Sequence, residues 1–143
     1  MTPGPSAGRA KLTLRIAAAL ATIQAIAHCI LFMRSLPGPG SPAWSLAQAM
    51  RVQAGPEHST YWGMYFGYGL LSALTAALVA GLIWLGAAFA NDCRTMARWL
   101  IGLVGTAVVL HAIVIGAYFF RVPLWFDLLV AALLAIGWMQ LRE

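Results

Sequence analysis

The sequence predicts an all-α integral membrane protein: a four-helix bundle whose first loop carries a short interfacial helix. Two features of composition lead to this class, since 62% of the 143 residues are hydrophobic and only 9% are charged, far from the values of water-soluble domains. The third observation is that the apolar residues gather in four long runs, each near the ~20 residues that a spanning helix needs. We therefore expect one membrane domain over residues 1–143, with the lipid bilayer as its surroundings.

The first span is expected over residues 14–34, after a Pro- and Gly-rich segment, residues 1–8, that we expect to be disordered. A secretory signal peptide is the alternative, because a basic start, an apolar run and small residues at positions 25–27 imitate its three regions. The apolar run continues past that point to Met33, which favours a spanning helix.

An extracytoplasmic loop is expected over residues 35–60, with a short helix inside it. Ser41 can act as the N-cap of this helix and Pro42 as its first residue, and a Gly-Pro pair ends it. Trp44 favours a helix that lies in the plane of the membrane interface. An ordinary loop helix folded over the bundle is the equal alternative.

Three further spans are expected over residues 61–90, 98–120 and 123–141. The second span opens with an aromatic cluster, which favours a position of its first turns among the lipid headgroups. A tight turn at residues 121–123 separates the last two spans.

The orientation follows from the distribution of the nine Lys and Arg residues, which are scattered in short segments between the apolar runs. Scattered charges argue against a nucleic-acid partner, which requires a contiguous basic face. Six of the nine lie on the side of the two termini, so the positive-inside rule predicts cytoplasmic N- and C-termini. We expect a multi-pass protein of the bacterial cytoplasmic (inner) membrane.

Small residues on two spans predict close contacts between helices, within the bundle or between protomers. They are Gly63, Gly67 and Gly69 on the second span, and Gly102, Gly105, Ala112 and Gly116 on the third. The expected partner is therefore a second copy of the chain or another membrane subunit.

Polar side chains at membrane depth are costly and each requires a partner or a use. His28 and His111 each lie twelve residues into their apolar run, so we expect them at similar depth. We expect His28, His111 and Asp127 to be the catalytic candidates of an outer-leaflet cavity. The candidate ligand-binding residues are Gln24, Tyr65, Tyr68, Arg121 and His58.

Two kinds of chemistry fit these groups: the imidazoles can ligate haem iron or another metal, and a His beside a carboxylate can act as acid and base. The structural alternative is that each His bridges helices and that Asp127 pairs with Arg121 or His111. The metal and the cofactor are left open.

The sequence also resembles a family of small, uncharacterised bacterial four-helix membrane proteins, through residues 59–70 (STYWGMYFGYGL) and 117–123 (AYFFRVP). This resemblance covers residues 28–126 and implies the same fold, but no activity. A weaker resemblance is to the styrene oxide isomerases, four-helix membrane enzymes with haem, through residues 39–42 and Trp44, and through Gly-Pro followed by Gly-Met. Where the isomerases carry a haem-ligating His, this chain has Gln53.

These observations predict a small membrane protein of unassigned activity, a homo-oligomer or a subunit of a complex. The alternative is a membrane-embedded enzyme or binder that acts on a lipophilic small molecule, an isomerase-like protein with haem as the cofactor that the weaker resemblance implies. A pore or carrier is disfavoured, because four helices enclose little space and no pair of broken helices is visible.

Overall fold

The computed structural model describes residues 5–52, 59–119 and 121–142, and within them the chain forms helices and no strand. The all-α fold class is therefore confirmed. The helices are α1 (Pro5–Ser35), α2 (Trp44–Ala49), α3 (Tyr61–Phe89), α4 (Arg94–Tyr118) and α5 (Arg121–Gln140).

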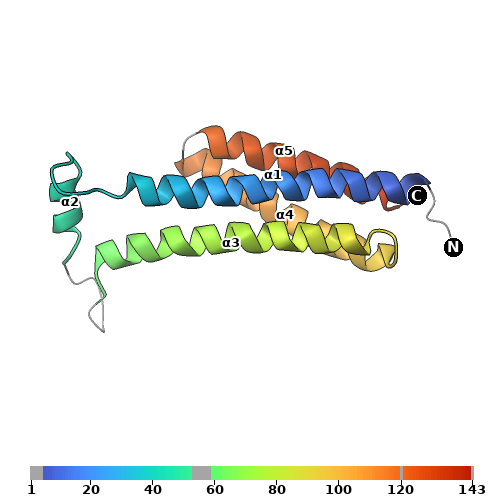
Figure 1. Ribbon diagram of the computed structural model, residues 1–143, viewed down its shortest axis with the longest axis horizontal. Coiled ribbons are helices and arrows are strands. Elements are labelled where there is room, and N and C mark those ends of the chain that lie inside the picture. The colour runs from blue at the N-terminus through green and yellow to red at the C-terminus, as the bar shows by residue number, and fades with distance from the viewer. Residues whose placement is uncertain (1–4, 53–58, 120, 143) are drawn as a thin grey trace.

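The four long helices form a bundle in which each helix runs opposite to the next (Figure 1). α1 packs against α3 and α5, and α4 packs against the same two helices, so α1 and α4 lie across the bundle from each other. Figure 1 places the N-terminal start of α1, the α3–α4 turn and the end of α5 at one end. At the other end, α1 and α3 reach beyond the α4–α5 hairpin.

All four long helices are long and apolar enough to cross a membrane. In each of them only 22% of the most apolar window is buried inside the bundle, so most of the apolar side chains face outward. Such a surface is stable in hydrocarbon and not in water. The protein is therefore a multi-pass membrane protein.

The first helix is longer than the predicted span. α1 begins at Pro5, so residues 5–8 belong to a helix and not to the disordered segment that the sequence suggested; residues 1–4 lie outside the described residues. The prediction counted only the apolar run, whereas Ala, Lys and Arg are good helix formers and Pro fits the first helical position, where no N–H partner is required.

The short helix α2 lies across the long direction of the bundle at the end away from the termini (Figure 1). Its N-cap is Ala43 and not Ser41, so the predicted cap is wrong: Ser41 instead accepts a backbone bond from Trp44 N in a preceding turn, at 3.0 Å. The end of α2 is tied to the start of α3, because Trp62 N donates to Met50 O at 2.8 Å.

The start of each later helix follows local chemistry. Thr60 caps α3, with its Oγ1 accepting from Gly63 N at 3.0 Å. α5 begins at Arg121, earlier than the predicted position 123, because Pro123 falls within the first turn, where helical N–H groups have no intrahelical partner.

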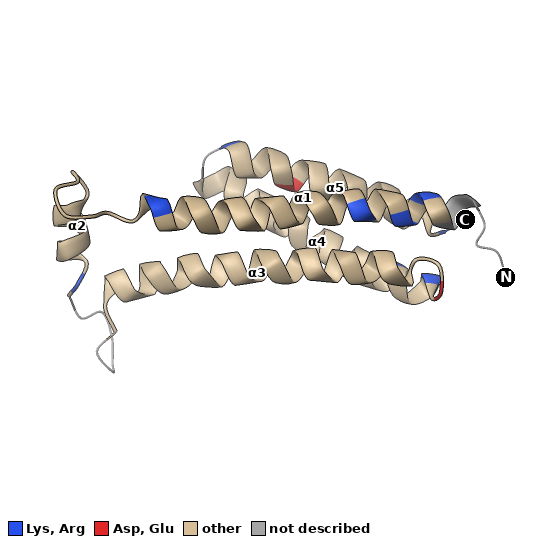
Figure 2. Cartoon of the chain, viewed as in Figure 1, with Lys and Arg blue, Asp and Glu red and all other residues tan. Residues whose placement is uncertain are grey.

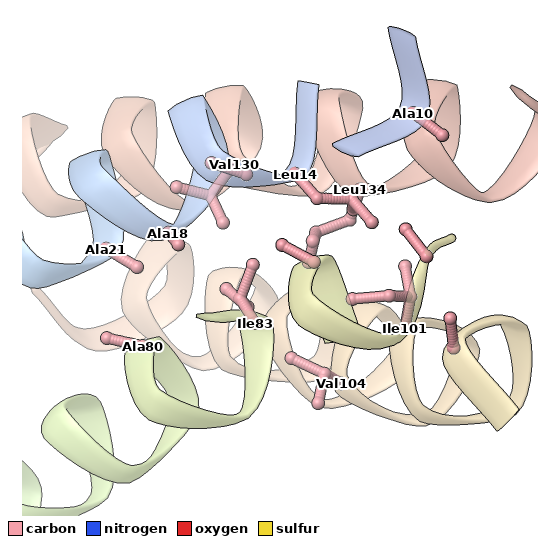
Figure 3. Close-up of a cluster of buried hydrophobic side chains, with 14 of the residues drawn as sticks. Ala10, Leu14, Ala18, Ala21, Ala80, Ile83, Ile101, Val104, Val130 and Leu134 are labelled. Atoms are coloured by element: carbon pink, nitrogen blue, oxygen red, sulfur yellow. The ribbon is translucent and has the colours of Figure 1, made fainter. Parts of the chain in front are cut away.

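The core lies in the half of the bundle toward the termini and consists of Ala, Leu, Ile and Val (Figure 3). α1 contributes mostly alanines, which bring its backbone close to its neighbours. Glycines receive the larger side chains: a Cβ added to Gly137 would lie 2.6 Å from Leu14 Cδ2, and one added to Gly86 would lie 2.5 Å from Ile101 Cδ1. Close approach of helices through small residues is the usual source of stability in lipid.

This packing predicts that Gly137→Ala destabilises the bundle. The new methyl group overlaps Leu14, which is fully buried, and overpacking of this kind costs about 1–3 kcal/mol. Unfolding in mixed micelles by titration with dodecyl sulfate, followed by circular dichroism, measures the change.

Gly81→Ala is the matched control. A Cβ at Gly81 has no atom within 4 Å. Because alanine has the higher helix propensity, this variant should keep the free energy of unfolding or raise it by up to about 1 kcal/mol. Equal losses in the two variants would contradict the Gly137–Leu14 contact.

Candidate functional site

The candidate site is centred on Asp127 of α5, whose side chain is buried although it lies among membrane-spanning helices. Asp127 is 4% exposed. Gln24 of α1 donates from Nε2 to Oδ1 at 2.8 Å, and Nδ1 of His111 on α4 lies 2.9 Å from Oδ2. Both carboxylate oxygens are thus occupied, each by a different helix, and three of the four spans meet at this carboxylate.

His111 is the outer member of this cluster. Its side chain is 50% exposed, on the outside of a bundle whose surface is apolar. Nδ1 is the nitrogen that faces Asp127, and with the carboxylate as acceptor it is the nitrogen that donates. The other nitrogen, Nε2, is then left as the functional atom, an acceptor when the imidazole is neutral.

A small apolar hollow of about 230 Å³ lies between α4 and α5, beside His111 and Asp127 along the chain. It is lined by Val109, Ala112, Ile113, Leu124 and Leu128. Its walls offer van der Waals contact to a hydrocarbon group, and two of its lining residues, Ala112 and Leu128, are the chain neighbours of His111 and Asp127.

His28 does not join this cluster in the described part of the chain. Its ring stacks on Phe32, with centroids 6.4 Å apart and planes 3° apart, and its Nε2 is buried without a hydrogen-bond partner among the described residues. Phe32 in turn contacts Tyr65 and Phe66 of α3. His28 therefore belongs to an aromatic contact between α1 and α3, one turn beyond Gln24.

The other predicted residues lie apart from Asp127. Tyr65 packs against Phe32 and Trp62, and Tyr68 is 66% exposed. Arg121 is exposed at the start of α5, and the described residues contain no ion pair between it and Asp127. His58 lies outside the described residues.

No group of three or more His, Cys, Asp or Glu side chains that could hold a metal ion is present among the described residues. His111 uses Nδ1 for Asp127, and His28 lies on α1, across the bundle from α4. Gln53, at the position of the haem ligand in the isomerase resemblance, lies outside the described residues. A haem or metal site remains a prediction.

Two polar contacts escaped the sequence analysis. Thr13 on α1 donates to Gln140 Oε1 on α5 at 3.0 Å, and two guanidinium groups, of Arg98 and Arg142, lie over the ring of Trp138. The positions of these basic residues at helix ends were visible in the sequence, but their common partner depends on the pairing of α4 with α5.

No protein-family model, no curated protein and no solved structure matches this chain. The fold and the site therefore stand on the geometry of the chain itself, and both resemblances stay predictions.

Proposed function

We propose that this protein binds a lipophilic small molecule within the membrane and that His111 is the group that recognises it. The observation that carries the proposal is the hydrogen-bonded series Gln24–Asp127–His111, which ends in a half-exposed imidazole on an apolar surface. A polar group at membrane depth is costly unless it has a partner. Asp127 and Gln24 are partners of each other, and Nε2 of the half-exposed His111 is the nitrogen that Asp127 does not contact.

The contacts among Gln24, Asp127 and His111 support a binding role for His111. Gln24 holds one oxygen of Asp127, and the other oxygen holds the ring of His111 in one orientation. Carboxylates orient catalytic and metal-binding imidazoles in the same way. Nε2 is thereby preorganised to accept a hydrogen bond, which reduces the entropy lost on binding. A molecule with one hydroxyl or N–H group and an apolar body matches this atom and the adjacent hollow.

The same pair supports acid–base chemistry on such a molecule, because an imidazole oriented by a carboxylate can take up a proton and return it. An isomerase-like activity would use this property and no other described residue. We place binding first because it requires only the contacts above.

The test is to identify what the purified protein carries. The wild-type chain is purified in mild detergent and extracted with organic solvent, and apolar molecules are quantified by mass spectrometry. We expect one molecule of the stated chemistry near one equivalent, reduced about tenfold in His111→Ala, since a hydrogen bond of this kind contributes about 1.4 kcal/mol.

Val114→Ala is the matched control, because Val114 is also exposed on α4 and lines neither the small hollow nor the site. It should retain the molecule. Equal retention by wild type and His111→Ala, in protein that keeps its helical circular dichroism, would reject the proposal.

Self-association is a second candidate, favoured by the placement of Gly63 and Gly67. Both glycines are exposed on α3; a Cβ added to Gly67 has no atom within 4 Å, and one added to Gly63 meets only the capping Thr60. This Gly-x-x-x-Gly face lies outside the bundle and is open to a second helix. Gly67→Leu should lower the mass measured by light scattering in detergent, whereas Gly81→Leu should not.

For location, the charge distribution supports a bacterial cytoplasmic membrane with both termini in the cytoplasm. Figure 2 shows the Lys and Arg residues concentrated at the two ends of the bundle, and six of nine belong to the end with the termini. A reporter fused after Glu143 should behave as cytoplasmic, and a periplasmic signal would reverse the orientation.

A further inference from the structure

A groove runs along the surface between α4 and α5 toward the end of the termini, and it shares only Val109 with the hollow near His111. Its volume is about 810 Å³, and it begins near the end of the bundle that carries the termini, at the start of α4 and the end of α5 (Figure 1). The groove is lined by Thr95, Arg98, Trp99, Ile101, Gly102, Leu103, Gly105, Thr106, Val109, Leu110, Ala131, Leu134, Ala135 and Trp138.

The groove exists because small residues form its floor. Ala131 and Ala135 on α5 face Gly102 and Gly105 on α4 across it. A Cβ at Gly105 would approach only Leu134 Cβ, at 3.9 Å, so a larger side chain there would fill open space. Beyond the polar end, the walls are almost entirely hydrocarbon.

The end of the groove nearest the termini is cationic. Arg98 lines it, and its guanidinium carbon lies 5.1 Å from the ring centroid of Trp138. Arg142 places its own guanidinium carbon 3.9 Å from the same ring. Two like charges thus contact one indole, so an anion bound at this end would lower the repulsion between them.

Arg98 lacks an anionic partner in the described part of the chain. Its Nε is buried and has no hydrogen-bond partner there. The ion pair found among the described residues joins His111 and Asp127 and does not include Arg98. Asp127 is already bonded by Gln24 and His111. Glu143, the chain neighbour of Arg142, lies outside the described residues.

We propose that this groove binds one anionic phospholipid, with an acyl chain along Gly102, Gly105 and Ala135 and the phosphate at Arg98 and Arg142. Charge complementarity carries the choice of occupant, since the groove is apolar along its length, Arg98 lines its cationic end, and Arg142 lies over the lining residue Trp138 at that end. Trp99 and Trp138 mark that end as the headgroup layer, where Trp is enriched. Arginine binds phosphate oxygens in bidentate fashion.

A second copy of the chain is a poorer occupant. All copies in one membrane share an orientation, so a symmetric pair meeting at this groove would place Arg98 and Arg142 of both copies at the same depth. Four guanidinium groups would then lie at one level of the pair and repel one another. A zwitterionic lipid fits the hydrocarbon walls but offers a net charge of zero to the arginines.

The experiment measures lipid binding to the delipidated full-length protein in detergent by native mass spectrometry. The probes are dioleoyl phosphatidylglycerol and dioleoyl phosphatidylcholine. We expect tighter binding of phosphatidylglycerol to the wild type, and about a fivefold loss of this preference in Arg98→Gln and in Arg142→Gln, the effect of one basic residue next to an anionic lipid.

Arg15→Gln is the matched control, because Arg15 is exposed on α1, does not line the groove and, unlike Arg142, has no contact with the lining residue Trp138. It should keep the preference. If Arg15→Gln lost the preference for phosphatidylglycerol to the same extent, general surface charge would explain the preference and the proposal would be overturned. A wild type without any preference would overturn it as well.

Gly105→Leu tests the groove without altering charge. It should lower binding of both lipids, because the leucine side chain occupies the space of the acyl chain. Unchanged lipid binding in this variant, or a change of oligomeric mass without loss of lipid, would also overturn the proposal. Retention of the bound small molecule at His111 is scored separately, so the two sites can fail independently.

Discussion

Asp127→Ala is expected to lower the free energy of unfolding by about 1–3 kcal/mol, because it removes two hydrogen bonds between helices, each worth about 0.6–1.7 kcal/mol in a membrane bundle. Gln24 and His111 would each lose the acceptor that now lies 2.8 and 2.9 Å away. Their donors would then remain unpaired in an apolar setting. Titration with dodecyl sulfate in mixed micelles, followed by circular dichroism, measures this loss.

A double-mutant cycle separates the two bonds. In a Gln24→Leu background, one partner of Asp127 is already gone, so Asp127→Ala should cost less than in the wild type. Asp92→Ala serves as the control, since Asp92 is exposed in the α3–α4 turn and its loss should change stability by less than about 0.5 kcal/mol. Additive effects of Gln24→Leu and Asp127→Ala would contradict the contact.

Part of this site is legible in the sequence. His111 and Asp127 are each eight residues from Phe119, which lies at the turn between α4 and α5. In an antiparallel pair of helices joined by a tight turn, residues at equal distances from the turn lie at the same level along the bundle. His111 and Arg121 were the two expected partners of Asp127, and among the described residues Asp127 pairs with His111.

The contact with Gln24 could not be reached in this way. Gln24 lies eleven residues before the end of α1 at Ser35, whereas Asp127 lies only six residues after the start of α5 at Arg121. The two residues meet because α1 overhangs the α4–α5 hairpin, as Figure 1 shows. The difference of five residues corresponds to about 8 Å along a helix, and nothing in the local sequence fixes this offset.

His28 shows the limit of counting depth along apolar runs. It was expected at the same depth as His111 and as part of the same cavity, because each residue follows twelve others in its run. α1, however, starts at Pro5 and lies across the bundle from α4. His28 thus packs with Phe32 against α3, since the face that a helix turns to each neighbour depends on the order of helices around the bundle.

The existence of the spans was predictable for a simpler reason: each depends only on length and hydrophobicity, and both are properties of one segment. The four apolar helices lie where the sequence placed them. Three helices begin earlier than predicted, α1 by nine residues at Pro5, α4 by four at Arg94 and α5 by two at Arg121, because helix propensity and capping extend beyond the apolar run.

The packing of Leu14 against Gly137 gives the second large effect. Leu14→Ala is expected to destabilise the bundle by about 2–4 kcal/mol, because Leu14 is fully buried and its removal leaves a cavity between α1 and α5. The lost contacts matter as much in lipid as in water, since packing drives helix association in both. Dodecyl sulfate titration measures the loss.

Combining Leu14→Ala with Gly137→Ala tests the contact itself. Gly137→Ala alone overlaps Leu14 Cδ2 and Cγ, which would lie 2.6 and 3.0 Å from the new methyl group. With Leu14 shortened, the same methyl group enters the vacated space instead, so the double variant should be more stable than the sum of the single losses predicts, by about 1 kcal/mol or more. Strict additivity would mean that α1 and α5 do not meet at these two residues, and the Gln24–Asp127 bond, which depends on the same helix pair, would lose its support.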